Sequence, residues 1–348
     1  MRILVTGGAG FIGSQAVGRF LAAGHEVRVL DRLVPSAHPD GVYTPPAGVD
    51  FWHGDVADPD LVAGACRGMD LVSHQAAMVG RGKEILDGPN YVHNNDLGTA
   101  TLLKAMTEAG IGRLVLASSV VIYGDSRYDC PLHGRVRASA RSRADLNAGR
   151  FEPRCGQCGT ELTASAVEED DVLDPPRNVY AVTKLAQEYL VGAWTRETGG
   201  TAAVLRYHNV YGPGMPFDSP YSGVTATFRS SVELGEAPRV YEDGLPRRDF
   251  VHVADVAEAN LAALAWTRPG FRAFTIASGE PRSIGELAAT MAAFAGAPEP
   301  VITGEYRIGD VRHIFASPKR AITELGWRPA VSFDDGITEF VGKPMRRG

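Results

Sequence analysis

Residues 6–13 of this chain read Thr-Gly-Gly-Ala-Gly-Phe-Ile-Gly. The stretch follows a short apolar run typical of a β-strand and opens a longer run with the spacing of a helix. Gly7 permits a tight turn, Gly10 lets the backbone approach a phosphate, and Gly13 lets the helix pack closely. The first N–H groups of the helix have no partner within it and can bind the same phosphate. The stretch therefore predicts a phosphate-binding turn.

Short apolar runs alternate with helical patterns on both sides of this turn. The runs are nearly continuous in apolar character, as expected for parallel strands covered by helices on both faces. Their order predicts a doubly wound α/β fold of the Rossmann type. The predicted strands are Ile3 to Thr6, Val27 to Leu30, Val49 to His53, Asp70 to Gln75, Arg113 to Ser118 and Ala202 to Tyr207, and the longer predicted helices are Ile12 to Ala23, Asp96 to Ala109 and Val179 to Glu197.

Two stretches depart from this alternation. Residues 125–170 are rich in Arg, Gly and Cys, and we expect them to form an insertion without an apolar core. After the last predicted strand, Pro and Gly punctuate mixed short elements, with a helix predicted from Gly223 to Leu234. We expect residues 1–205 to form the dinucleotide-binding domain, and residues 206–348 to form a smaller α/β substrate domain, from which residues near 248–275 return to the sheet.

Composition excludes several classes of protein. The 348 residues carry a net charge of −6, so the chain has no basic surface of the kind that binds nucleic acid. The first apolar run is too short for a signal peptide, and no run approaches the roughly 18 apolar residues of a membrane span. Four Cys are too few for a secreted disulfide framework. These observations predict a soluble cytoplasmic protein.

An acidic residue follows the second predicted strand. Asp31 lies 21 residues after Gly10, where a carboxylate accepts hydrogen bonds from the adenosine ribose and repels a 2′-phosphate. The sequence therefore favours NAD over NADP, although Arg32 could accommodate a phosphate. Asp55 and Val56 follow the third strand and could meet the adenine; capping of a loop is the alternative.

A tyrosine and a lysine share one face of a predicted helix. Tyr180 and Lys184 lie four residues apart. A nearby ammonium favours the phenolate and would lower the pKa of the tyrosine toward neutral pH, which suits a general base. Ser119 follows the fifth strand, at the edge where such sheets bind ligands, and could hydrogen-bond the oxygen that Tyr180 deprotonates. A surface Tyr/Lys pair and a serine that only ends a strand are the alternatives.

The insertion contains two pairs of metal-binding side chains. Cys130 and His133 are separated by two residues, as are Cys155 and Cys158. Four such donors can complete a tetrahedral zinc site with no open position, and ligation would stabilise a segment that lacks apolar residues. The alternatives are a redox pair at Cys155 and Cys158, or reduced thiols without a ligand.

Several motifs follow one another in order along nearly the whole chain. They are TGGAGFIG at 6–13, HQAA at 74–77, NDLGT at 95–99, SSVVIYG at 118–124, YAVTK at 180–184, RYHNVYGPG at 206–214, RRDFVHVADVA at 247–257 and GDVRH at 309–313. Taken together, they resemble the extended short-chain dehydrogenases/reductases, in particular the NAD-dependent nucleotide-sugar epimerase/dehydratase family. The resemblance implies that Ser119, Tyr180 and Lys184 form a catalytic triad. The insertion, with Arg127-Tyr128 before its first Cys, is similar to that of epimerases that act on nucleotide-linked L-rhamnose.

The resemblance also implies ligands for particular residues and a homodimer formed through the helices at 96–109 and 179–197. Guanidinium groups at Arg248 and Arg307 suit the diphosphate of a UDP- or dTDP-sugar, with solvated surface charges as the alternative. Gln75 and His208 depart from the family pattern. The expected NAD-binding residues are Gly7, Gly10, Phe11, Ile12, Gly13, Asp31, Arg32, Asp55, Val56, Ala76, Asn95, Tyr180, Lys184 and Tyr207, and the expected substrate-binding residues are Ser119, Asn209, Arg248, Arg307 and Asp310.

The residues after Ser119 bear on the reaction. The 4,6-dehydratases of the family have Asp-Glu there to supply acid and base, whereas Val120-Val121 cannot exchange protons. The sequence therefore predicts C4 epimerisation through a 4-keto intermediate with tightly held NAD. The alternatives are an NADPH-dependent 4-ketoreductase, disfavoured by Asp31, a non-catalytic cofactor sensor, disfavoured by the intact Tyr180 and Lys184, and an interaction protein that docks through its insertion.

Overall fold

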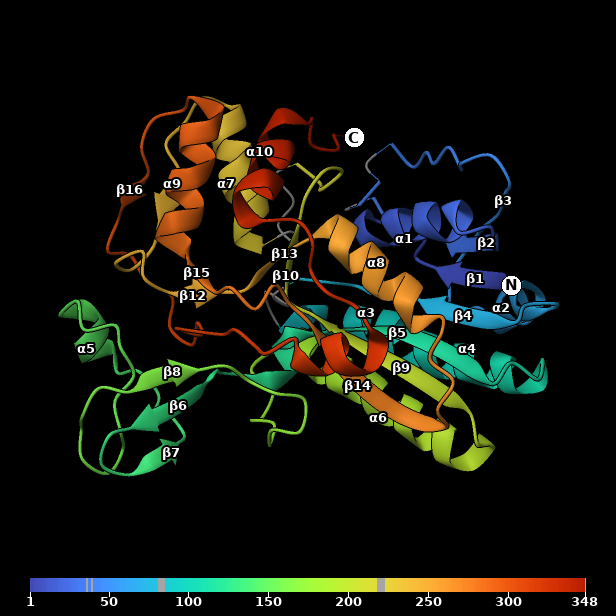
Figure 1. Cartoon of the computed structure of the whole chain (residues 1–348), viewed down its shortest axis with the longest axis horizontal. Coiled ribbons are helices and arrows are strands. Elements are labelled where there is room, and N and C mark those ends of the chain that lie inside the picture. The colour runs from blue at the N-terminus through green and yellow to red at the C-terminus, as the bar shows by residue number, and fades with distance from the viewer. Residues whose placement is uncertain (36, 39, 81–84, 218–222, 348) are drawn as a thin grey trace.

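The computed structural model describes all residues except 36, 39, 81–84, 218–222 and 348. Its centre is a parallel sheet of seven strands in the order β14-β9-β5-β4-β1-β2-β3 (Figure 1). The chain changes direction across the sheet between β1 and β4, and sheets of this kind bind ligands at the carboxyl ends of such strands. The strands are β1 (Arg2–Thr6), β2 (Glu26–Asp31), β3 (Val49–His53), β4 (Leu71–His74), β5 (Arg113–Ser119), β9 (Thr201–Tyr207) and β14 (Gly270–Ile276).

Helices cover both faces of this sheet, which confirms the predicted Rossmann fold. α1 and α8 pack together on one face, and α2, α4 and α6 line the other, so an apolar core forms on each side. Every residue of β9 is buried because both of its faces are covered, whereas β3 lies at the edge and is partly exposed. The helices are α1 (Phe11–Ala22), α2 (Pro59–Cys66), α4 (Gly98–Glu108), α6 (Val179–Thr198) and α8 (Val253–Ala263).

Local sequence fixes the ends of α6, which carries the Tyr/Lys pair. The Asn178 side chain caps its first turn by accepting a hydrogen bond from Ala181 N at 2.9 Å, and Gly199 ends it with a φ of 71°. The helix expected from Asp96 begins instead at Gly98, because the preceding residues form a wider π-helical turn that apolar spacing does not distinguish from an α-helix. The short helices are η1 (Ile85–Asp87), α3 (Gly88–Tyr91), η2 (Val92–Leu97), η3 (Val120–Tyr123) and η4 (Ala321–Leu325).

The residues after β9 form short strands and helices around an apolar core of their own, and one segment returns to the sheet. In that segment β14 pairs with β9 along its whole length, and α8 packs on α1. The other elements are β10 (Asn209–Tyr211) paired with β13 (Phe250–His252), β11 (Arg239–Val240) with β16 (Val301–Ile302), and β12 (Arg247–Arg248) with β15 (Arg282–Ser283), beside α7 (Gly223–Glu233), α9 (Ile284–Ala295) and α10 (Phe333–Gly342).

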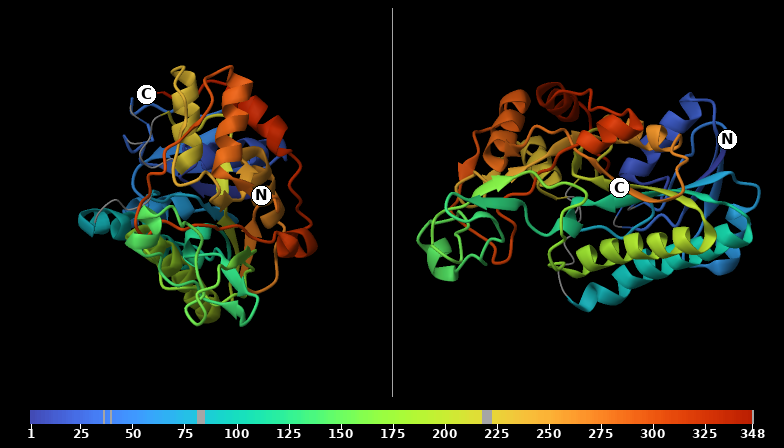
Figure 2. Two further views of the ribbon diagram at one scale, coloured as in Figure 1. Left: turned by 90° about the vertical axis from the view of Figure 1, so that its left-hand side faces the viewer. Right: turned by 60° about the horizontal axis from the view of Figure 1, so that its bottom comes forward.

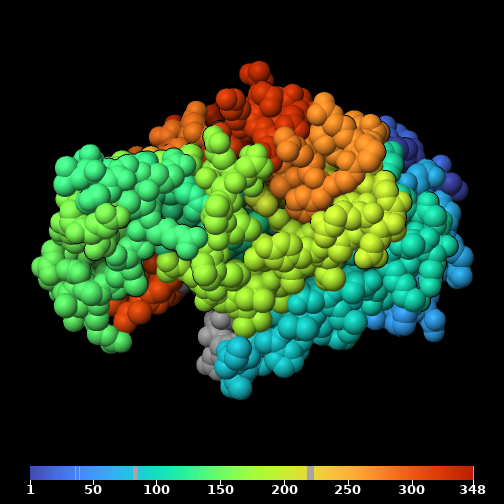
Figure 3. All heavy atoms as spheres, turned by 90° about the horizontal axis from the view of Figure 1, so that it is seen from below, coloured from blue at the N-terminus to red at the C-terminus, as the bar shows by residue number. Residues whose placement is uncertain are grey.

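The insertion is a folded lobe at the end of the molecule opposite the N-terminus (Figure 2). Seen from below, its green atoms stand out from the rest of the chain, beside atoms in the orange-red of the C-terminal part (Figure 3). Tyr128, Cys130, Cys155 and Leu162 form a small buried cluster inside it, so the expectation that it lacks an apolar core is wrong. Four residues so far apart in sequence give no periodic pattern. The lobe contains β6 (Arg127–Cys130), β7 (Gly134–Val136), α5 (Arg143–Asn147) and β8 (Thr163–Ser165), with strand order β7-β6-β8.

Candidate active site

The glycine-rich turn joins β1 to α1 at the carboxyl edge of the sheet. Gly7 has a φ of +70°, and a Cβ there would lie 2.5 Å from the backbone nitrogen of Ala76. A Cβ on Gly13 would lie 2.1 Å from the carbonyl oxygen of Gly7, so neither position tolerates a side chain. Gly10 is the N-cap of α1 and makes no side-chain cap. The geometry leaves the first N–H groups of α1 available to a phosphate.

Asp31 ends β2 beside this turn. One carboxylate oxygen accepts a hydrogen bond from Ala9 N at 3.0 Å, and the other accepts from Leu33 N at 2.9 Å. Arg32 turns to Asp55, with Nη1 2.7 Å from Oδ2. This ion pair occupies the guanidinium that could otherwise bind a 2′-phosphate, which agrees with the predicted preference for NAD.

Four other expected NAD-binding residues lie on α1, after β3 and in η2. Ile12 contacts the core beneath α1, and Phe11 contacts the core of the C-terminal part. Val56 is 7% exposed and lies against Gly98. Asn95 is fully buried, and its Nδ2 donates to Thr183 Oγ1 at 2.9 Å, so it ties η2 to α6. Asn95 therefore stabilises the packing of η2 against α6, in addition to any contact with a cofactor.

Tyr207 lies at the end of β9 with its hydroxyl directed at α8. The hydroxyl donates to Gln75 Oε1 at 3.1 Å and lies 2.8 Å from Nδ2 of Asn260, which donates to it. Gln75 Nε2 in turn donates to Asn260 Oδ1 at 2.9 Å. Gln75, which departs from the family pattern, therefore forms a ring of hydrogen bonds with Tyr207 and Asn260.

The three expected catalytic residues come together from two elements. Ser119 is the last residue of β5, and Tyr180 and Lys184 lie on the first turns of α6. The Ser119 hydroxyl hydrogen-bonds the Tyr180 phenol. Lys184 Nζ donates to the carbonyl oxygen of Ala117 at 2.9 Å and is 3% exposed. A phenol beside a hydroxyl and a buried amine at a sheet edge is an arrangement that can exchange a proton with a bound alcohol.

Burial dominates the protonation of this group. It raises the pKa of Tyr180 to about 12, against the hydrogen bond with Ser119. It lowers the pKa of Lys184 to about 7, against the attraction of Glu188 and Asp96. The expected lowering of the tyrosine pKa is therefore wrong for the chain by itself, because desolvation penalises both charged forms. Shifts of this size at a sheet edge are typical of functional sites.

Two carboxylates near Lys184, those of Glu188 and Asp96, favour its charged form. Sequence reasoning missed Asp96. Glu188, one turn further along α6, forms a buried bidentate pair with Arg206 and accepts a hydrogen bond from Ser118 at 2.5 Å. Asp96 lies in η2, where burial raises its pKa to about 6 while Lys184 opposes the rise. The signal for Asp96 was its place next to Asn95 in the NDLGT motif.

The expected substrate-binding residues other than Ser119 lie on the C-terminal part. Asn209 begins β10, and its Oδ1 is buried without a partner in the described residues. Arg248 donates from Nη2 to the Val311 carbonyl at 2.6 Å, and from Nη1 to the carbonyl of the next residue. Arg307 is exposed and lies over the ring of Tyr241 at 4.9 Å. Arg248 is thus attached to residues 306–313, the stretch that contains both Arg307 and Asp310.

His208 separates Tyr207 from Asn209 and is 4% exposed. Burial lowers the pKa of His208 to about 3, so the imidazole is neutral at physiological pH. Neither ring nitrogen has a hydrogen-bond partner in the described part of the chain. A histidine in this state is unsuited to proton transfer near neutral pH.

The four expected metal ligands converge in the insertion. Their ligand atoms all lie within 4.8 Å of one another. Cys130 Sγ lies 3.6 Å from Cys158 Sγ, and His133 Nδ1 lies 3.5 Å from Cys130 Sγ and 3.6 Å from Cys155 Sγ. A tetrahedral zinc ion with Zn–S near 2.3 Å places ligand atoms about 3.6–3.8 Å apart. The residues therefore fit zinc, and the sulfur separation is too long for a disulfide.

Comparison with known proteins identifies the family of the chain. The model of the NAD dependent epimerase/dehydratase family matches residues 3–142 and 148–277. The chain belongs to this family. It is 34% identical to the dTDP-L-rhamnose 4-epimerase of Burkholderia thailandensis, over 97% of this chain and 93% of that protein. It is 31% identical to the UDP-glucose 4-epimerase of Streptomyces lividans, over 94% of this chain and 92% of that protein. The resemblance inferred from the motifs is confirmed.

Solved structures agree with this assignment. The UDP-glucose 4-epimerase of Thermus thermophilus in complex with NAD is 32% identical to the chain, with a TM-score of 0.76 and coverage of 98% of both chains. A second neighbour, MoeE5 in complex with UDP-glucose and NAD, is 28% identical with a TM-score of 0.77, again over 98% of both chains. None of the helices in the described part of this family member has the length and apolar character to cross a membrane.

Proposed function

We propose that this enzyme is an NAD-dependent nucleotide-sugar 4-epimerase. The observation that carries the proposal is the convergence of Ser119, Tyr180 and Lys184 at the carboxyl edge, beside a glycine turn that requires glycine at 7 and 13. Named relatives and NAD-bound structural neighbours are 4-epimerases of nucleotide sugars, which supports the same reaction here.

The residues around the turn fit NAD. The Gly7–Gly13 turn would hold the pyrophosphate, Asp31 the adenosine ribose and Lys184 the nicotinamide ribose. NAD would supply a hydride acceptor that later returns the hydride. Bound NAD would also add positive charge near Tyr180, which favours its phenolate.

The chain itself would move the proton. Tyr180 takes the proton from the C4 hydroxyl of the sugar while Ser119 hydrogen-bonds the same oxygen, and a 4-keto sugar forms as the hydride leaves C4. Rotation of the keto sugar presents its other face, and Tyr180 returns the proton to the oxygen of the epimer. Val120-Val121 supply no acid or base for loss of water, so dehydration does not compete.

We further propose that Arg248 and Arg307 bind the diphosphate of a UDP- or dTDP-sugar, with Asn209 and Asp310 at the same site. Guanidinium forks match phosphate oxygens, and a chain of net charge −6 must supply cations locally for a dianion. Residues 1–205 would hold NAD and residues 206–348 the substrate.

A structural zinc ion is the third part of the proposal. Cys130, His133, Cys155 and Cys158 would hold it, and it would take no part in the sugar chemistry because four protein ligands leave no open position. We expect about one equivalent of zinc in enzyme purified without chelator; less than about 0.2 equivalents would contradict the site.

A homodimer in the cytoplasm completes the proposal. Val182 and Tyr189 on α6 are 49% and 68% exposed, and Leu97 just before α4 is 48% exposed, which supports pairing through these helices. Sedimentation should give twice the 37.1 kDa mass of the chain.

Incubation with a panel of UDP-, dTDP-, GDP- and CDP-sugars tests the proposed reaction. We expect NMR to show two C4 epimers of one UDP- or dTDP-sugar approaching equilibrium without net formation of NADH. Mass spectrometry of the cofactor released on denaturation should identify NAD. Consumption of NADPH with a 4-keto sugar would instead support the ketoreductase.

A further inference from the structure

The stretch 306–313 is held at its start by the insertion. The Tyr306 hydroxyl donates to Asn147 Oδ1 at 2.5 Å, and Arg141 Nη2 donates to the carbonyl oxygen of Asp310 at 2.7 Å. Asn147 and Arg141 belong to the insertion, in and just before α5. The loop that carries the proposed diphosphate ligand Arg307 is therefore attached to the insertion on both sides of that residue.

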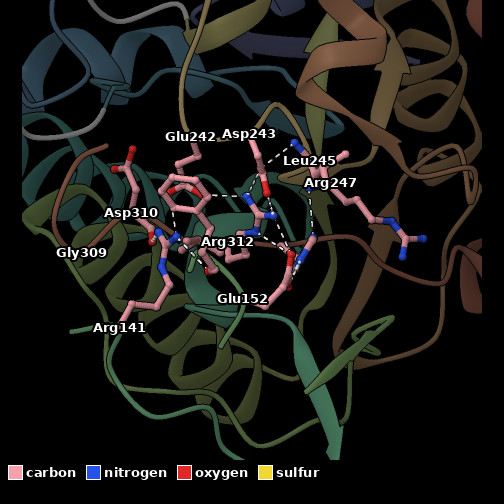
Figure 4. A network of polar contacts seen from close by, with 12 residues as sticks. Arg141, Glu152, Glu242, Asp243, Leu245, Arg247, Gly309, Asp310 and Arg312 are labelled. Atoms are coloured by element: carbon pink, nitrogen blue, oxygen red, sulfur yellow. Dashed lines mark hydrogen bonds and ion pairs between the residues drawn. The ribbon is translucent and has the colours of Figure 1, made fainter. Parts of the chain in front are cut away.

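The end of the same stretch is attached more strongly. Arg312 is 1% exposed, and its five N–H donors all have acidic partners (Figure 4). Glu152 of the insertion receives two of these hydrogen bonds, at 2.6 and 2.9 Å, and Glu242 and Asp243 receive the other three. A guanidinium with every donor satisfied is fixed in orientation as well as position.

Glu152 also reaches β12 through the neighbouring histidine. His313 Nδ1 accepts a hydrogen bond from Arg247 N at 3.2 Å, so the proton lies on Nε2, which donates to Glu152 Oε2 at 2.9 Å. Arg248 follows in β12 and donates to the Arg312 carbonyl at 2.9 Å. One carboxylate of the insertion therefore fixes the two backbone segments that orient Arg248.

Glu152 lies close to the proposed metal ligands along the chain. Cys155 follows it after two residues, and this connection is held in antiparallel pairing, with Leu162 N donating to the Pro153 carbonyl at 2.9 Å and Cys155 N donating to the Thr160 carbonyl at 2.8 Å. The apolar cluster inside the insertion is small. The conformation of this hairpin would therefore depend on ligation at Cys155 and Cys158.

We propose that Glu152 is a positioning residue that couples the Cys/His cluster to the diphosphate site, so that a zinc ion bound in the insertion strengthens binding of the nucleoside diphosphate. The coupling deepens the proposed function and rests on it. It assigns the insertion a role in substrate affinity, exerted through Arg312 and His313, with no contact between the metal and the substrate.

Calorimetric titration of the NAD-containing enzyme with UDP and with dTDP tests the coupling. We expect Glu152→Gln to raise the Kd of the preferred nucleotide about tenfold, with zinc and NAD content unchanged, kcat within about twofold and KM raised in parallel with Kd. The matched control is Glu161→Gln in the same hairpin, because Glu161 pairs only with the exposed Arg154 among its described contacts. Its Kd should equal that of the unaltered enzyme.

Removal of zinc with a chelator provides the second arm. Chelation should raise the Kd of the unaltered enzyme about as much as Glu152→Gln does. In the Glu152→Gln variant, chelation should raise the Kd by less than a further factor of about two, because both changes interrupt the same connection between the Cys/His cluster and the diphosphate site. A Kd unchanged in Glu152→Gln, or effects of the two changes that multiply fully, would overturn the coupling. Failure of the unaltered enzyme to bind either nucleotide would instead contradict the proposed substrate class.

Discussion

Burial disfavours the charged forms in two clusters of polar groups in this enzyme, but only one of the clusters has partners that outweigh it. At the carboxyl edge of the sheet, Tyr180 and Lys184 have few partners, and burial moves the pKa of each toward the neutral form, to about 12 and about 7. Between the insertion and the C-terminal part, Arg312 keeps its charge, and although burial opposes it, hydrogen bonds from His313 and Arg312 lower the pKa of Glu152 to about 2.

This difference corresponds to two roles, the transfer of a proton and the positioning of backbone segments. A group that exchanges protons needs a neutral form close in free energy to the charged one, which sparse partners and desolvation provide. A group that fixes backbone segments needs a permanent charge with every donor satisfied, which the acids around Arg312 provide. Substitutions in the two clusters should therefore change different measured quantities.

The largest expected effect is on turnover at the sheet edge. Tyr180→Phe keeps the ring, which packs against Tyr91 with centroids 6.0 Å apart, and removes only the hydroxyl. We expect kcat to fall on the order of 10³-fold, about 4 kcal/mol, with NAD content unchanged, as measured by NMR of the epimers and by cofactor analysis. Tyr189→Phe, an exposed tyrosine on the same helix, is the control. Unchanged turnover in Tyr180→Phe would assign the proton transfer to another group.

The next effect is on stability at the second cluster. Arg312→Met leaves Glu152 and Asp243 without their arginine, whereas Glu242 keeps its ion pair with Arg141, and we expect urea unfolding to show a loss of about 3 kcal/mol. Arg135 has a side chain that is 56% exposed, with its Nε 3.6 Å from Asp129 Oδ1, so Arg135→Met should change stability by less than about 0.5 kcal/mol. If Arg312→Met lowers the free energy of unfolding no more than Arg135→Met does, the buried ion pairs of Arg312 do not stabilise the fold.

The pH dependence of stability follows from the same cluster. The pKa of Glu152 is lowered from 4.5 to about 2, so the contribution of its charge is fully present above pH 4.5 and is lost as the pH falls toward 2. Acid titration of the unaltered enzyme should show this loss, and Glu152→Gln should lack it. An identical acid profile for both proteins would contradict the fixed charge.

We expect Lys184→Met to lower kcat/KM about 10²-fold, a smaller effect than the preceding ones. The pH dependence of kcat/KM identifies the cause. If the reactive state combines a Tyr180 phenolate with a Lys184 ammonium, its population falls tenfold per pH unit below about 7 and is constant above that value, up to about 12. In Lys184→Met the break near pH 7 should disappear, and kcat/KM should rise steadily with pH. A break that persists in the variant would assign it to another group.

The sequence predicted what depends on local pattern. All six strands expected up to residue 207 are confirmed to within one residue at each end, because apolar runs and glycine turns determine them locally. The convergence of Ser119 and Tyr180 followed from the rule that parallel strands and their helices meet at one edge. The Cys/His spacing likewise predicted a cluster that the geometry brings together.

Tertiary packing determined what the sequence did not predict. The raised pKa of Tyr180 results from burial by other elements, which no spacing within α6 reveals. Arg312 stands in a recognised motif, yet its partners at Glu152 and Glu242 come from segments far apart in the chain. The small core of the insertion was missed for the same reason.

Transfer of hydrogen at C4 tests the central claim most directly. We propose that the nucleotide sugar found in the panel be prepared with deuterium at C4 and incubated with the enzyme in ordinary water. The account predicts that NMR shows the epimer with deuterium fully retained at C4 and no free reduced cofactor, because the C4 hydrogen leaves and returns within one site. Protium at C4 of the epimer, or reduced cofactor released in step with product, would contradict it.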